Sequence, residues 1–130
     1  MKYILMMNTM RARQGVPNWR QADLQAHIAF MKNLNRGLHE SGELVSAEGL
    51  TFPEQAKLVR AGKDGAPITD GVFPESKEFL AGFWIVDVDT AERAYAIAAE
   101  VSAAPGPGGA ALSMPIEVRP IMNAPSQEMF

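Results

Sequence analysis

The segment 79-FLAGFWIVDVDTAERAYAIAAEV-101 decides the fold, because it joins the most apolar run of the chain to an amphipathic helix pattern. Phe79–Val88 is apolar on both alternating sides, which predicts a central strand that is buried on both faces. Asp89 and Glu92 form a capping-box-like pair, after which apolar residues recur at helical spacing over Ala91–Val101. A strand followed directly by such a helix is typical of one half of a layered α+β unit.

The amino-terminal half shows the same order. Tyr3–Met7 is a continuous apolar run and predicts a first strand, while residues 8–17 form a polar loop that ends in Gly-Val-Pro. A helix is expected from Asn18, where Gln21 completes a second capping-box-like pair, to Gly42. Its apolar stripe consists of Leu24, Ile28, Met31, Leu34 and Leu38.

The remaining segments complete two split βαβ halves, the arrangement of a ferredoxin-like α+β fold with an antiparallel sheet and two helices on one face. The expected pieces are strands over Glu43–Thr51, Lys57–Arg60 and Ile116–Arg119, a turn at Gly62–Gly65 and a loop over Pro67–Pro74. Residues 1–122 are expected to form the single domain, and residues 123–130 a tail. Because strand Phe79–Val88 is apolar on both sides, the face without helices needs a cover, and a homodimer with face-to-face sheets supplies it.

Composition excludes several classes of function. The chain has 12 basic and 15 acidic residues and a net charge of -3, whereas nucleic-acid binding normally needs a basic stripe. It has no cysteine, which removes disulfides, thiolate metal sites and a cysteine nucleophile. No apolar run approaches the ~20 residues of a membrane span, so no membrane association and a cytoplasmic location are expected. The two histidines are twelve residues apart and lack zinc-site spacing, so neither a metal nor a cofactor is predicted.

One long block resembles a known family. The block runs from Thr69-Asp70-Gly71-Val72-Phe73-Pro74 through Lys77-Glu78 to the strand around Phe83, and is joined by a second block, Ile116–Ile121. Both resemble the YCII-related family, specifically its DGPF branch, and the similarity spans nearly the whole chain. Val72 stands where that branch has proline, so the turn loses a residue that would fix φ near about −65°.

The resemblance implies a ferredoxin-like fold that dimerises into an α+β barrel. It also implies chemistry with a His/Asp pair and no cofactor in some members, and an association of the DGPF branch with sigma factors. Two functions follow as expectations. The first is binding of a small polar or anionic molecule at the barrel, with lyase- or isomerase-like acid/base chemistry. The alternative is a non-catalytic interaction protein associated with a sigma factor in transcription regulation, and a third possibility is a structural subunit without a ligand.

His27 is the candidate acid or base. It follows Leu24 by three residues and precedes Met31 by four, so it lies on the apolar face of the first predicted helix. The unperturbed pKa of a histidine side chain, about 6.5, suits proton transfer near neutral pH. The alternative is a core histidine that is satisfied by one backbone partner. The YCII family carries a histidine at the matching position.

The other candidates are ionisable residues of the predicted strands and turns. Asp70 is the predicted catalytic partner of His27, although an aspartate before Gly71 can equally serve as a turn residue. Glu117 and Arg119 lie on one side of the last strand, and arginine suits bidentate carboxylate recognition. The predicted substrate-binding residues are Glu78, Arg119, Glu117 and Arg60, and the alternative for all four is a solvated sheet edge whose ion pairs contribute ~0–1 kcal/mol each.

Overall fold

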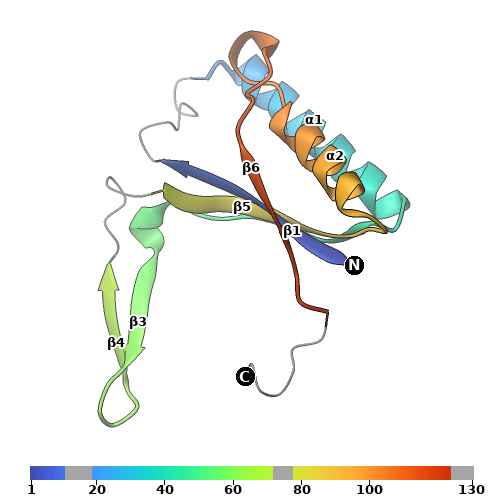
Figure 1. Cartoon of the computed structure of the whole chain (residues 1–130). Coiled ribbons are helices and arrows are strands. Elements are labelled where there is room, and N and C mark those ends of the chain that lie inside the picture. Colours follow the sequence, from blue (N-terminus) through green and yellow to red (C-terminus); the bar gives the residue numbers. More distant parts are fainter. Residues whose placement is uncertain (11–18, 72–77, 124–130) are drawn as a thin grey trace.

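An antiparallel sheet and two helices make up the body of the protein (Figure 1). The computed structural model of the chain describes residues 1–10, 19–71 and 78–123. The elements are β1 (Lys2–Met10), α1 (Gln21–Glu40), β2 (Leu44–Gly49), η3 (Pro53–Gln55), β3 (Lys57–Ala61), β4 (Pro67–Gly71), β5 (Glu78–Asp87), α2 (Ala91–Ser102), η5 (Pro107–Gly109) and β6 (Ile116–Pro120). The predicted capping residue Asn18, the position of Val72 and residues 124–130 of the predicted tail lie outside the described residues.

The main sheet has the strand order β2-β5-β1-β6, with every neighbouring pair antiparallel. The apolar strand β5 lies inside the sheet, between β2 and β1. Both helices lie on one side of the sheet in Figure 1. The predicted α+β, ferredoxin-like fold is therefore confirmed.

The hydrophobic core lies between the helices and one face of the sheet. Alternation along the strands turns Tyr3 and Leu5 of β1 toward the helices, next to Val86 and Trp84 of β5. Ile97 and three other large side chains are fully buried there. Each such side chain contributes roughly 1.5–3 kcal/mol relative to an exposed position. The four largest fully buried side chains are those of Leu5, Ile97, Val86 and Val101.

The other face of the sheet is apolar at its centre and carries no helix. Ile4 is aligned with Ile85, and Met6 with Phe83, so these four side chains form one patch opposite the core. All four are half-buried within the chain, and none belongs to the core cluster. We call this surface, defined by Ile4, Met6, Phe83 and Ile85, the open face.

A separate hairpin of β3 and β4 projects from the sheet (Figure 1). Its turn is the predicted one, since Gly62 donates its N–H to the Ala66 carbonyl at 2.7 Å and Gly65 has φ 85°. The prediction of a loop over residues 67–74 is wrong for Pro67–Gly71, which pairs with Lys57–Ala61. The reason is that cross-strand pairing overrides the weak local strand preference of a Pro- and Gly-bounded segment.

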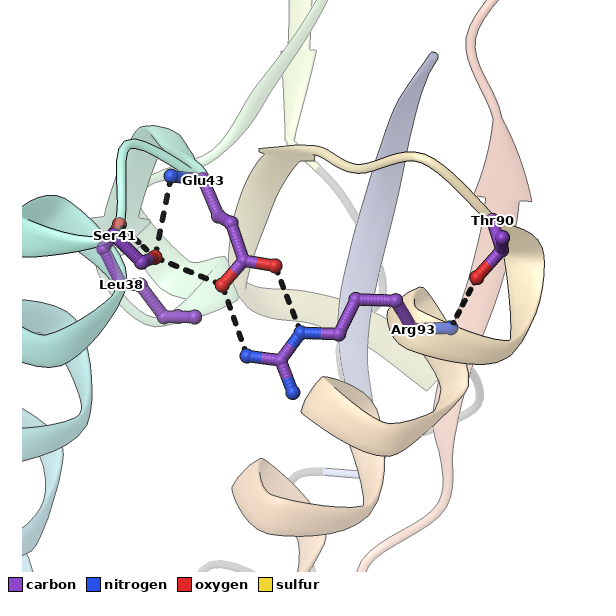
Figure 2. A network of polar contacts seen from close by, with 5 residues as sticks. All are labelled: Leu38, Ser41, Glu43, Thr90 and Arg93. Carbon is purple, nitrogen blue, oxygen red and sulfur yellow. Dashed lines mark hydrogen bonds and ion pairs between the residues drawn. The ribbon is translucent and has the colours of Figure 1, made fainter.

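An ion pair joins the end of α1, the start of β2 and the first turn of α2 (Figure 2). Arg93 of α2 contacts the Glu43 carboxylate with two nitrogens, Nε at 2.7 Å and Nη2 at 2.9 Å. Ser41 donates its hydroxyl to the same carboxylate at 2.8 Å. Because these contacts are charge-assisted, they lower the pKa of Glu43 from 4.5 to about 2, with the Arg93 hydrogen bonds as the largest cause.

Three local predictions about the helices are wrong. Helix α1 begins at Gln21 with Arg20 at the N-cap, and the Arg20 side chain makes no capping hydrogen bond. Helix α2 is capped by Thr90 and not by Asp89, because the Thr90 hydroxyl accepts the Arg93 N–H at 3.1 Å. Ile28, predicted to lie in the apolar stripe of α1, is 44% exposed.

Candidate functional site

A pocket of about 240 Å³ lies between helix α1, the end of strand β2 and the middle of strand β5. Its α1 wall consists of His27, Met31 and Asn35, which share one side of the helix because they are spaced four residues apart. The opposing lining includes Gly49 and Gly82, which form the last pair of the β2–β5 ladder. Since neither residue has a side chain, this end of the sheet leaves the space under α1 unfilled.

Gly82 is required by the close approach of its neighbours. A Cβ atom at this position would lie 3.0 Å from the carbonyl oxygen of Glu48 and 3.7 Å from Cε of Met7. The first distance is tight, and the neighbour is backbone that cannot move without shifting β2. Gly82, within the predicted central strand, is therefore the residue that permits the pocket.

The lining is largely apolar, with a few polar groups. Met7, Met31 and Trp84 contribute apolar surface, which is typical of small-molecule sites. Trp84 donates its Nε1–H to the Asn35 Oδ1 at 2.9 Å, and this hydrogen bond holds the Asn35 amide in place at the pocket.

His27 is the titratable side chain of this lining, because Glu48 is aligned with Phe83 and contributes its backbone. Asn35 and Glu48 were not predicted as site residues. The eight-residue spacing from His27 to Asn35 is a signal that could have found the first of them.

His27 contacts a backbone carbonyl and an aromatic ring. Its Nδ1 lies 3.0 Å from the carbonyl oxygen of Pro105, and its ring centroid lies 5.4 Å from that of Trp19 in an edge-to-face arrangement. The predicted alternative, a histidine with one backbone partner, is therefore found at the Nδ1 atom. A role as acid or base also remains compatible with the structure, because the same side chain lines the pocket.

Asp70 lies elsewhere in the chain. It belongs to β4 of the projecting hairpin, and its carboxylate pairs with Arg60 across the hairpin at 3.5 Å. Both side chains are mostly exposed, so solvent weakens this ion pair. Neither residue is among those that line the pocket. Within one chain, the structure does not bring Asp70 together with His27.

The remaining predicted residues belong to the main sheet and do not line the pocket. Glu117 and Arg119 lie on the same side of β6 as the open face, since they align with Met6 and Ile4 respectively. Asn8 donates its Nδ2–H to the Glu117 Oε1 at 3.3 Å. Glu78 is exposed at the start of β5. The structure therefore brings Glu117 and Arg119 together, but not with His27.

A glycine-rich loop closes over the start of α1. Asp23 is buried, and its carboxylate accepts a hydrogen bond from Arg20 at 3.3 Å and lies near the backbone N–H of Gly108. These contacts lower the pKa of Asp23, with the Arg20 hydrogen bond as the largest cause. Gly108 has φ 70°, a conformation that strongly favours glycine. The loop after α2 thus holds a defined position against α1 through Pro105 and Gly108.

A family model described as the YCII-related domain matches residues 1–111, which include both helices and the strands β1 to β5. The chain belongs to the YCII-related family. The match names no branch, so the DGPF assignment of this YCII-related protein stays a prediction. No curated protein matches the chain in sequence.

In residues 1–10, 19–71 and 78–123, no three or more His, Cys, Asp or Glu side chains are grouped so that they could hold a metal ion. Among the helices described, none combines the length and apolar character needed to cross a membrane.

Proposed function

We propose that this YCII-related protein binds a small molecule in the pocket under α1, with His27 as the group that donates or accepts a proton. The observation that carries the proposal is the position of His27 in a pocket that two facing glycines leave open. The volume of about 240 Å³ favours a compact ligand. Acid/base chemistry without a cofactor, of a lyase or isomerase type, is the reaction class that such an imidazole supports.

The pocket favours a neutral polar ligand over an anionic one. No lysine or arginine lines it among the described residues. An anionic ligand would therefore be desolvated there without a compensating cation. Aromatic and thioether groups instead suit an apolar body, with one polar group near His27.

Phenol and benzoate test this proposal because they share a ring and differ in charge. The neutral phenol is expected to bind more tightly than the anionic benzoate. We expect phenol to shift the indole N–H signal of Trp84 in ¹H–¹⁵N spectra, since that N–H lies at the pocket. His27→Ala should weaken phenol binding about tenfold, the effect of losing one hydrogen bond of ~1.4 kcal/mol. His39→Ala, which changes an exposed histidine at the far end of α1, is the matched control. Equal affinity in the parent and His27→Ala would exclude the proposed role of His27.

We further propose that two copies pack through their open faces. Ile4 and Ile85 provide an apolar centre, and Glu117 and Arg119 lie beside it on β6. The hydrophobic effect favours burial of this apolar sheet face between two copies. Sedimentation should show a dimer that Ile85→Glu converts to a monomer. Tyr95→Glu, at an exposed position on α2, should leave the dimer intact.

The dimer is also where the other predicted residues could act. Because Asp70 and Arg60 pair with each other on the hairpin, a role for Asp70 beside His27 would require the hairpin of a second copy. Substrate-binding roles for Glu78, Glu117 and Arg119 likewise depend on how a second copy lies over the sheet. If Asp70→Asn leaves phenol affinity unchanged while His27→Ala reduces it, the His/Asp pair is excluded and the pocket is retained.

The hairpin favours a second candidate function, a non-catalytic interaction protein. Leu58, Val59 and Ile68 are 58%, 59% and 46% exposed. An isolated two-stranded hairpin with exposed apolar residues is marginal in water, which favours a protein partner. The family resemblance suggests a sigma factor as that partner. If Leu58→Ser with Ile68→Ser leaves binding to a purified cognate sigma factor unchanged, this interaction through the hairpin is excluded.

A further inference from the structure

The connection between His27 and the loop at Pro105 determines which ring nitrogen carries the proton. A backbone carbonyl can only accept, so the 3.0 Å contact of His27 Nδ1 with the Pro105 oxygen requires a hydrogen on Nδ1. In a neutral imidazole the other nitrogen, Nε2, then holds the lone pair. No hydrogen bond to Nε2 is found within the described part of the chain.

A second contact holds the same loop against the same helix. The backbone N–H of Gly108 lies near the carboxylate of Asp23, one helical turn before His27, while His27 meets Pro105. The loop thus contacts α1 at two points, three residues apart in the loop. The edge-to-face contact of Trp19 restricts rotation of the His27 ring further.

We infer that the Pro105–Gly109 loop is a positioning element that fixes His27 as the Nδ1–H tautomer and leaves Nε2 as the acceptor in the pocket. The ligand class follows from this assignment. An acceptor nitrogen binds a group that donates hydrogen, such as a hydroxyl, and in a reaction it acts first as a base. The ligand part of the inference rests on the proposed function, whereas the tautomer is a property of the protein without ligand.

The loop offers a specific way to disturb this contact. Gly106 is buried next to Pro105, and a Cβ atom there would lie 2.5 Å from Cδ2 of Leu112. Gly106→Ala must therefore displace the loop or Leu112. The loop is closed by the Gly106 N–H to Ala110 oxygen bond of 2.7 Å, so the displacement should reach the Pro105 carbonyl. Adding Leu112→Ala removes the atoms that cause the clash.

The experiment measures the imidazole nitrogens of His27 by ¹⁵N NMR. The chain has two histidines, so a His39→Gln background leaves a single imidazole. At about pH 9, where imidazoles in general are neutral, we expect a protonated Nδ1 and an unprotonated Nε2. Gly106→Ala should convert this single tautomer to a mixture, and Gly106→Ala with Leu112→Ala should restore it. A predominant Nε2–H form in the parent, or a tautomer indifferent to Gly106→Ala, would overturn the inference.

Two variants keep the test independent of whether Gly106→Ala folds. Asp23→Ala releases the second contact of the loop and should also produce a tautomer mixture, while Asp23→Asn retains an acceptor and should not. Phenol binding that survives in the parent despite an Nε2–H tautomer would refute the inference and leave the proposed function standing. If the parent protein has the Nδ1–H tautomer but does not bind phenol, the proposed function is refuted and the tautomer assignment stands.

Discussion

Replacing Glu43 by glutamine should destabilise the protein at neutral pH and remove part of its sensitivity to acid. Glu43 is the junction between α1, β2 and α2, and its side chain is only 19% exposed. Lowering the pKa of Glu43 from 4.5 to about 2 corresponds to an upper limit of ~3 kcal/mol of folding free energy. Because the Arg93 side chain is 42% exposed, solvent screens the pair, and we expect a loss of about 1–2 kcal/mol at pH 7.

The sign of the pH dependence follows from the direction of the shift. The folded state holds the Glu43 carboxylate charged, so its stabilisation is complete above the ordinary pKa of 4.5. That stabilisation is lost as the pH falls toward the folded-state pKa of about 2. The difference in unfolding free energy between the parent and Glu43→Gln should therefore be largest at pH 7 and half lost by about pH 3.

Urea unfolding at a series of pH values from 7 down to 3 measures this difference directly. Glu40→Gln is the control, since Glu40 is exposed in the last turn of α1. Removing its negative charge near a helix C-terminus should change stability by only ~0.3 kcal/mol, in the stabilising direction. A difference between the parent and Glu43→Gln that stays constant across this pH range would contradict the electrostatic explanation.

Three other substitutions test the helices and the pocket. Gly37→Ala should raise the unfolding free energy by about 1 kcal/mol in urea titrations, because Gly37 is inside α1 and no atom lies within 4 Å of the added Cβ; a loss of stability would show that the helix needs glycine there. Thr90→Ala should cost ~1 kcal/mol, since it removes the hydroxyl that accepts the Arg93 N–H, while Thr90→Ser should retain most of it. Gly82→Ala should reduce phenol binding and destabilise the protein by roughly 1–3 kcal/mol, because its Cβ would lie 3.0 Å from the Glu48 carbonyl. Unchanged phenol affinity in calorimetry would show that Gly82 does not shape the pocket.

The fold could be predicted from the sequence because its signals are periodic and local. The apolar run over β5 and the helical spacing after it placed a central strand and α2 correctly, and the same reasoning found β1 and α1. The errors lie where local signals are weak. Capping by Thr90 instead of Asp89 is a shift of one residue between two good caps. The strand β4 was missed because its glycine and proline are typical of loops.

The candidate site was predictable only in part, because it depends on contacts between distant segments. Helical spacing predicted that His27 faces the core, and the structure places it in a pocket. Its partner is the carbonyl of Pro105, which lies 78 positions away and has no side-chain signature. Residue chemistry alone favours Asp70 as a turn residue, and only the family motif makes it a partner of His27; in the structure β3 and β4 carry it into a hairpin where Arg60 is its partner.

The proposed chemistry of the pocket depends on backbone groups more than on charged side chains. Facing glycines create the space, a carbonyl fixes the tautomer of His27, and a backbone N–H lies near the Asp23 carboxylate. Such groups cannot be removed by a single side-chain deletion, so an alanine scan of charged residues would miss them. Substitutions that add atoms, such as Gly82→Ala and Gly106→Ala, are therefore the informative perturbations, because each forces a neighbouring backbone or side chain to move.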